Sequence, residues 1–257
     1  MALLRRRTLH LVRHAESNWN VLTAGEHIGA HPHLIDVDSD LSPKGEAQIE
    51  ALHQAAPLAP PLELILASPL RRALRTAVAL RDANGGAAAV PMRVEPRATE
   101  WLENSCDCGR PGVEIQRDFG DSIQGLAELG DSWWPQLPKE DAFGHPRGGS
   151  ATLAALASGG REPAASVDLR CSQLLDSLLY EFPQTSSIAV VAHCMVLHKL
   201  ETMLRQHLTL NAAAAAGGDS SSGGSSGSGG SVVDVEYLDN TEVRSIVIES
   251  VVNEEMD

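Results

Sequence analysis

Three short apolar segments, each followed at once by polar residues and then by a helical pattern, constrain the fold of this 257-residue chain most strongly. They lie at residues 8–12 (TLHLV), 62–67 (LELILA) and 187–192 (SIAVVA). Strands that are apolar along their whole length and lead into helices are typical of a parallel sheet with helices on both faces. We therefore predict an α/β fold, a single-domain three-layer α/β/α sandwich around a mostly parallel central sheet.

Helical patterns fill the stretches between these strands. After the second strand, Ser68 and Pro69 have the residue types of an N-cap and a first helical position, and LRRALRTAVALRDA (70–83) continues the helix. Apolar residues at helical spacing predict further helices at residues 43–56, at 167–182 and from 193 to about 206.

The last part of the chain is divided by a low-complexity stretch. Residues 211–231 (NAAAAAGGDSSSGGSSGSGGS) are too poor in apolar groups to order, so we predict a disordered insert. Residues 232–250 alternate apolar and polar positions around an Asp-Asn turn and predict a pair of strands. A segment below roughly 40 residues rarely holds a core of its own. We therefore expect the strand pair to dock back on the sheet, so that residues 1–257 form one domain.

Composition narrows the partners and the cell compartment. With 43% hydrophobic and 21% charged residues the chain is typical of a soluble globular protein, and its net charge of −14 argues against nucleic acid and anionic membranes as partners. It has neither an apolar run of membrane-spanning length nor a secretory signal pattern, which indicates a cytoplasmic protein with reduced cysteines. His31-Pro-His33 lacks a third ligand and Cys106-x-Cys108 alone is a weak signal, so we expect no metal and no cofactor.

Cationic and imidazole side chains follow all three strands. Arg13-His14, the segment 68–72 and His193 come directly after them, and in such sheets ligands bind beyond the carboxyl ends of the strands. Arginine presents a planar set of donors to phosphate oxygens. A neutral histidine beside it can attack phosphorus, and a carboxylic acid with a raised pKa can protonate the leaving oxygen. Taken alone His14 could be an ordinary strand-end histidine, but the convergence favours a phosphate site.

Five segments resemble, in order, those of the histidine phosphatase superfamily, the phosphoglycerate-mutase-like proteins of the branch 1 type. They are RHAESNWN (13–20), LSPKGEAQ (41–48), SPLRRALRT (68–76), VVAHCMVLHKL (190–200) and DNTEVRSIVI (239–248). The resemblance implies that His14 is the phosphorylated nucleophile and His193 its catalytic partner, with Arg13, Asn20 and Arg72 binding the phosphoryl group. The family spacing selects Arg72 over its neighbours Arg71 and Arg75.

The proton donor is sought in ATEWLENSCDCG (98–109), which resembles a form of the acid segment found in some eukaryotic members. This resemblance places the acid at Glu100, with Glu103 as the alternative. A glutamate beside Trp101 could also simply flank a helix. Cys194 stands where the family usually has a glycine after the second histidine.

The resemblance implies a metal-independent phosphomonoester phosphatase that acts on a small molecule through a phosphohistidine. One alternative is a phosphoglycerate-type mutase; the family's mutases continue after the acid with Arg-His-Tyr-Gly, whereas Glu100 is followed by Trp-Leu-Glu-Asn. The other is an inactive module that binds a phosphorylated ligand, which would not need the nucleophile. We expect the insertion 104–149 to cap the pocket with its basic and tryptophan residues, and Trp133-Trp134 either stack on a substrate or pack within a lid. The basic residues are Arg110, Arg117 and Arg147. Nothing in the sequence fixes an oligomeric state.

Overall fold

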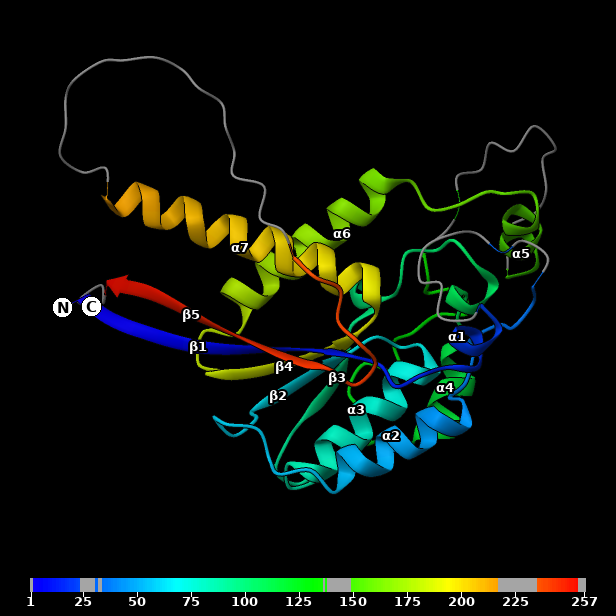
Figure 1. The fold of residues 1–257 in the computed structure, drawn as a ribbon, viewed down its shortest axis with the longest axis horizontal. Coiled ribbons are helices and arrows are strands. Elements are labelled where there is room, and N and C mark those ends of the chain that lie inside the picture. The colour runs from blue at the N-terminus through cyan, green and yellow to red at the C-terminus, as the bar shows by residue number, and fades with distance from the viewer. Residues whose placement is uncertain are drawn as a thin grey trace, which may run out of the picture.

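The computed structural model describes residues 2–23, 31, 34–135, 137, 149–216 and 235–253. Its centre is a five-stranded sheet in the order β3-β2-β4-β1-β5, in which β5 alone runs antiparallel to its neighbour. Helices α2, α3 and α4 cover one face of the sheet, and α6 and α7 cover the other (Figure 1). The predicted three-layer α/β/α sandwich is therefore confirmed.

The elements follow one another in the order expected of strands that alternate with helices. They are β1 (Ala2–Arg13), α1 (Asn18–Leu22), α2 (Pro43–His53), β2 (Leu64–Ala67), α3 (Arg71–Ala83), β3 (Met92–Val94), α4 (Gly112–Phe119), α5 (Gly149–Ala157), α6 (Ala164–Asp176), β4 (Ser187–Ala192), α7 (Cys194–Ala216) and β5 (Val243–Asn253). Short 3-10 turns lie at Pro96–Ala98 and Ser105–Asp107, and a π-helical turn at Ser177–Glu181 continues α6.

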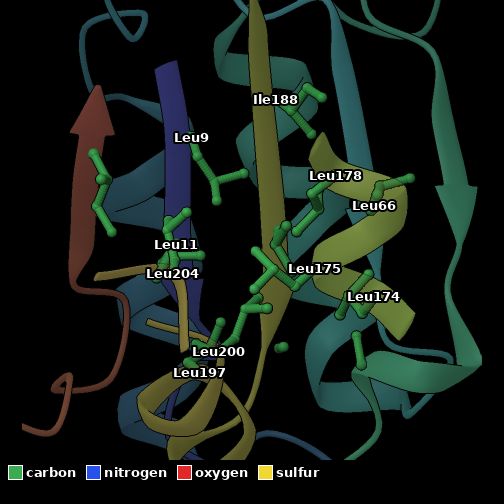
Figure 2. Packing of buried hydrophobic residues seen from close by; sticks show 14 of the residues in the cluster. Leu9, Leu11, Leu66, Leu174, Leu175, Leu178, Ile188, Leu197, Leu200 and Leu204 are labelled. Atoms are coloured by element: carbon green, nitrogen blue, oxygen red, sulfur yellow. The ribbon is translucent and has the colours of Figure 1, made fainter. Parts of the chain in front are cut away.

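The central strand β4 shows why the apolar runs form a parallel sheet. All six of its residues are buried. Ile188 and Val190 pack among the leucines of α6 and α7, as Figure 2 shows for Ile188, whereas Ala189 and Val191 pack against the α3 face. A strand covered on both sides favours apolar side chains on both faces, which explains the apolar run from Ile188 to Ala192.

Strand β1 is longer than the predicted segment 8–12. It pairs with β4 only from Thr8 onward, and from Ala2 to Val12 it pairs antiparallel with β5. Residues 5–7, three arginines ahead of the predicted segment, belong to the strand because β5 supplies their backbone partners. Arg7 is buried, and its guanidinium donates to the carbonyl oxygens of Phe182 at 2.6 Å and Thr185 at 2.9 Å.

Two expectations for the last part of the chain are corrected. Residues 211–216, predicted as the start of the insert, are helical and extend α7, because a run of alanines has high helix propensity; residues 217–231 lie outside the described residues. Within residues 235–250 the structure shows one strand, β5, and not a pair. Ahead of it, the carbonyls of Glu236 and Leu238 accept from the guanidinium groups of Arg244 and Arg13.

Among the residues that the structure describes, no helix is both long enough and apolar enough to cross a membrane.

Candidate active site

His14 lies directly after β1, at the carboxyl end of the parallel strands. Its backbone N–H donates to the Ala192 carbonyl at 3.0 Å, and its carbonyl accepts from Asn240 Nδ2 at 2.8 Å. Its ring Nδ1 lies 2.7 Å from the Ala15 carbonyl oxygen. Because a carbonyl oxygen only accepts, Nδ1 carries a proton, so in the neutral form of the ring the lone pair lies on Nε2. The ring of His193 is 4.9 Å away between centroids.

The loop after His14 is held by residues from two of the sequence segments described above. The Ala15 N–H donates to Thr76 Oγ1 at 2.9 Å, and the Glu16 N–H donates to Gln48 Oε1 at 2.8 Å. Helix α2 approaches this loop so closely that a Cβ on Gly45 would lie 2.0 Å from the Glu16 carbonyl oxygen. The spacing of these residues therefore serves to hold the backbone on which the histidine is mounted.

His193 follows β4 and is fully buried. Its Nε2 lies 2.8 Å from Ser68 Oγ, while its Nδ1 has no hydrogen-bond partner among the described residues. Burial lowers the pKa of His193 well below its usual value, and the nearby cation of Arg72 lowers it further. The ring is therefore neutral near pH 7. The Ser68 side chain therefore contacts His193. The prediction that Ser68 is the N-cap of α3 is wrong, because α3 begins at Arg71 and has no side-chain cap.

Two buried arginines complete a cationic pocket. Arg13 is 2% exposed, and its Nη1 donates to the Leu238 carbonyl at 2.8 Å. Arg72 is 3% exposed, and its Nη2 lies 3.1 Å from Asp107 Oδ1. The neighbouring arginines of the same helix, Arg71 and Arg75, instead form ion pairs with Asp40. Of these three helix arginines, Arg72 is the one that lines the pocket.

The pocket gathers the sequence-predicted residues from separate parts of the chain. Asn20 lies at its rim in α1, where its Oδ1 accepts from the Ser17 N–H at 3.0 Å and holds the start of that helix. The pocket is lined by Arg13, His14, Ser17, Trp19, Asn20, Arg72, Glu100, Trp101, Glu103, Asn104, Cys106, Asp107, Cys194 and Met195. His193 is not one of these lining residues; its ring contacts that of His14, which is.

Glu100 has the environment of a carboxylic acid that keeps its proton. Burial raises its pKa, and the nearby carboxylate of Asp107 raises it further. The backbone N–H groups of Trp101 and Met195, at 2.9 and 3.2 Å from its two oxygens, oppose this effect only in part. The alternative acid, Glu103, also lines the pocket, but it binds Arg161 Nη1 at 3.3 Å.

Sequence reasoning missed the group that holds the Glu100 loop. Arg170 of α6 is 9% exposed, and its guanidinium donates to the carbonyls of Thr99 at 2.5 Å and Glu100 at 3.1 Å. The same guanidinium binds both oxygens of Glu162, whose carbonyl accepts from Trp101 Nε1 at 2.8 Å. The only signal for this group is an arginine in a helix that is otherwise apolar on its buried side.

We expect Arg170→Met to lower the free energy of unfolding by about 3–5 kcal/mol, since it leaves the Glu162 carboxylate buried without its partner. Arg161, whose side chain is 65% exposed, is the matched control, and Arg161→Met should change stability by no more than about 0.5 kcal/mol. Urea titrations of the three proteins measure both values. Equal midpoints for the two variants would show that Arg170 does not hold this loop.

We further expect Glu100→Gln to gain stability relative to the original chain as the pH rises. The folded-state pKa of Glu100 lies above its usual value of 4.5, so the original chain loses stability as the pH rises from 4.5 through the folded-state pKa, whereas glutamine does not titrate. Thermal unfolding of both proteins between about pH 4.5 and 8 measures the difference in Tm. A difference that does not change with pH would contradict the raised pKa.

Only the first residues of the insertion 104–149 that the structure describes line the pocket; its two tryptophans pack away from it. Cys106 and Asp107 line the pocket, whereas Trp133 and Trp134 do not. The two indoles meet edge to face at 5.8 Å and pack in a hydrophobic cluster with Leu102, Cys108 and Leu156. The packing alternative for this pair is therefore the one that the structure shows. Arg110 binds Asp38 and Asp118, Arg117 lies beside Asp118, and Arg147 and His33 lie outside the described residues.

The two cysteines of the Cys106-x-Cys108 pair are buried thiols. Burial raises the pKa of both, to about 12 for Cys108, which disfavours the thiolate that binds metals. Within the described ranges, no three histidine, cysteine or acidic side chains are grouped so that they could hold a metal ion.

The two facing histidines and the two buried arginines lie at the carboxyl end of a mostly parallel sheet, which is where α/β proteins bind their ligands. The profile of the histidine phosphatase superfamily (branch 1) matches residues 9–213. The chain belongs to this superfamily.

The chain is also similar to individual proteins. A phosphoglycerate mutase-like protein of Arabidopsis thaliana is 36% identical over 98 residues, which is 36% of each chain, so the match spans about a third of that relative. Among solved structures, the ecdysone phosphate phosphatase of Bombix mori has a TM-score of 0.53 at 13% identity, over 96% of this chain and 92% of its own. A mycobacterial hydrolase has a TM-score of 0.49 at 22% identity, over 97% and 98% of the two chains.

Proposed function

We propose that the protein is a metal-independent phosphomonoester phosphatase that works through a phosphohistidine. In the first step the lone pair of His14 Nε2 forms a bond to phosphorus as the bond from phosphorus to the ester oxygen breaks. Glu100 gives its proton to that oxygen, so the product leaves as an alcohol. Arg13 and Arg72 bind the negative charge of the transferring group, the part that a metal ion plays in other phosphoryl-transfer enzymes.

In the second step water attacks phosphorus from the side that the alcohol has left. The Glu100 carboxylate takes the proton of the water, inorganic phosphate forms, and the His14–phosphorus bond breaks to restore the neutral ring. His193 supports both steps as a neutral donor or acceptor, since its unpartnered Nδ1 would find a partner in a phosphoryl oxygen.

One observation carries this proposal. The hydrogen bond from His14 Nδ1 to the Ala15 carbonyl fixes the tautomer whose Nε2 can attack, in a pocket that also holds a buried cation and an acid with a raised pKa. A module that only binds a phosphorylated ligand would need the cation and not the acid. Glu100 lines the pocket beside His14, which favours the enzyme.

The mutase is the second candidate, and the Arabidopsis relative bears the name phosphoglycerate mutase-like. A mutase returns the phosphoryl group to a hydroxyl of a second substrate and must hold that substrate by its carboxylate. Trp101, which follows the acid here, lines the pocket with an aromatic ring in place of a cation. This difference favours water as the acceptor.

Release of inorganic phosphate from a panel of small phosphomonoesters, measured with EDTA present, tests the proposal. We expect hydrolysis that EDTA does not reduce. The panel includes 3-phosphoglycerate with a bisphosphate primer, and formation of 2-phosphoglycerate faster than phosphate would replace the phosphatase by the mutase. Binding of inorganic phosphate without turnover of any ester would replace it by the binding module.

A further inference from the structure

A second groove shares a wall with the pocket that holds His14 and Glu100. Trp101 and Met195 line both. Beyond them the groove runs along α7 to His198 and Met203 and is bordered by Tyr237. We propose that this groove holds the organic group of the phosphomonoester, and that it selects an uncharged aromatic or largely apolar group; this rests on the function proposed above.

The position of the acid decides on which side of the phosphoryl group the organic group lies. Glu100 protonates the oxygen that joins phosphorus to the organic group, so that group begins beside Glu100. The carboxyl oxygens of Glu100 accept from the backbone N–H groups of Trp101 at 2.9 Å and Met195 at 3.2 Å. These two residues are therefore the first surface that the organic group meets as it leaves the phosphate pocket, and they form the entrance to the groove.

The side chains of the groove favour an uncharged ring in the organic group over a charged one. Tyr237 and His198 stack with their ring centroids 4.3 Å apart, and Tyr237 is 41% exposed. Lys199 lies 5.9 Å above the Trp101 ring, but it is ion-paired with Asp168 and so offers little to an anion. Within the described residues, the groove thus presents aromatic faces, two methionines and the neutral polar side chains of Thr202 and Gln206, and its lysine is paired. This lining favours contacts with an uncharged ring.

Two aryl esters with leaving groups of similar acidity separate binding in the groove from chemistry. We expect kcat/KM to be about tenfold higher for 2-naphthyl phosphate than for phenyl phosphate. The second ring would bury roughly 55 Å² more apolar surface in the groove, and this area corresponds to about a tenfold effect. A naphthyl phosphate that carries a sulfonate on its far ring should lose this preference, because the groove would have to desolvate an unpaired anion.

Tyr237→Ala should reduce the naphthyl-to-phenyl ratio to about threefold or less, since it removes roughly half of the expected apolar contact. The matched control is Tyr180→Ala on the turn that continues α6, where the ring is 67% exposed and lies outside the groove; it should leave the ratio unchanged. Hydrolysis of both esters at equal kcat/KM, or a ratio that Tyr237→Ala does not alter, would overturn the groove while leaving the phosphatase intact. Failure to hydrolyse phenyl phosphate or any other ester would overturn the proposed function itself, and the groove with it.

Discussion

Replacing His14 by alanine should lower phosphatase activity by about 10⁴-fold or more, because it removes the nucleophile that forms the bond to phosphorus and divides the reaction into two steps. Rapid alkaline quenching of the original protein during turnover of a ³²P-labelled ester should trap a protein-bound phosphate that is stable to alkali and labile to acid. His14→Ala should trap none.

The matched control is His53→Ala. His53 is exposed at the end of α2, outside the pocket, so this variant should retain full activity and the same amount of trapped phosphate. Activity that persists in His14→Ala within about tenfold of the original would rule out the phosphohistidine, since loss of a nucleophile costs far more than that. Binding of phosphate by His14→Ala, measured by calorimetry, shows that the arginines still form the pocket.

The second large effect is expected at Glu100, and it depends on the leaving group. Glu100→Gln should slow hydrolysis of an alkyl phosphate by about 10²–10⁴-fold, because an alkoxide leaves poorly without a proton. Hydrolysis of 4-nitrophenyl phosphate should slow by no more than about tenfold in the first step, since its phenolate leaves without protonation. Single-turnover kinetics on both esters measures the two effects.

Glu103→Gln is the control for this experiment, because Glu103 lines the same pocket but binds Arg161. It should affect both esters equally and by less than about tenfold. If Glu103→Gln gave the dependence on the leaving group instead, the roles of the two glutamates would be exchanged. Equal losses on both esters for both variants would mean that neither residue is the acid.

The sequence predicted the parts of the fold that depend on local patterns. Mostly apolar runs identified β1, β2 and β4, because strands buried on both faces favour apolar side chains. Strand β3 (Met92–Val94) was missed, since three residues with Arg93 in the middle show no such run. The length of β1 was underestimated because its first half depends on β5, which lies at the other end of the chain.

The same limit applies to the site. His14, Arg13 and Arg72 stand in short segments with a strong pattern of their own, and the structure brings them to one pocket with Glu100. Arg170 and Glu162 hold that acid from a helix and a loop that follow it at a distance, and nothing in their local sequence points to Glu100. Residues such as these, which hold a proposed catalytic residue through hydrogen bonds to its backbone, can therefore be identified only from the folded structure.

The pairing of β1 with β5 (Figure 1) has a kinetic consequence. It joins segments at opposite ends of the sequence, and contacts of such high sequence separation carry a large loop-closure entropy, so they tend to form late in folding. The carbonyl of Leu238, which holds Arg13, and the amide of Asn240, which holds the His14 carbonyl, both lie just ahead of β5. We therefore expect a refolding chain to recover its helical circular dichroism before its activity, which should appear in step with the docking of its final strand.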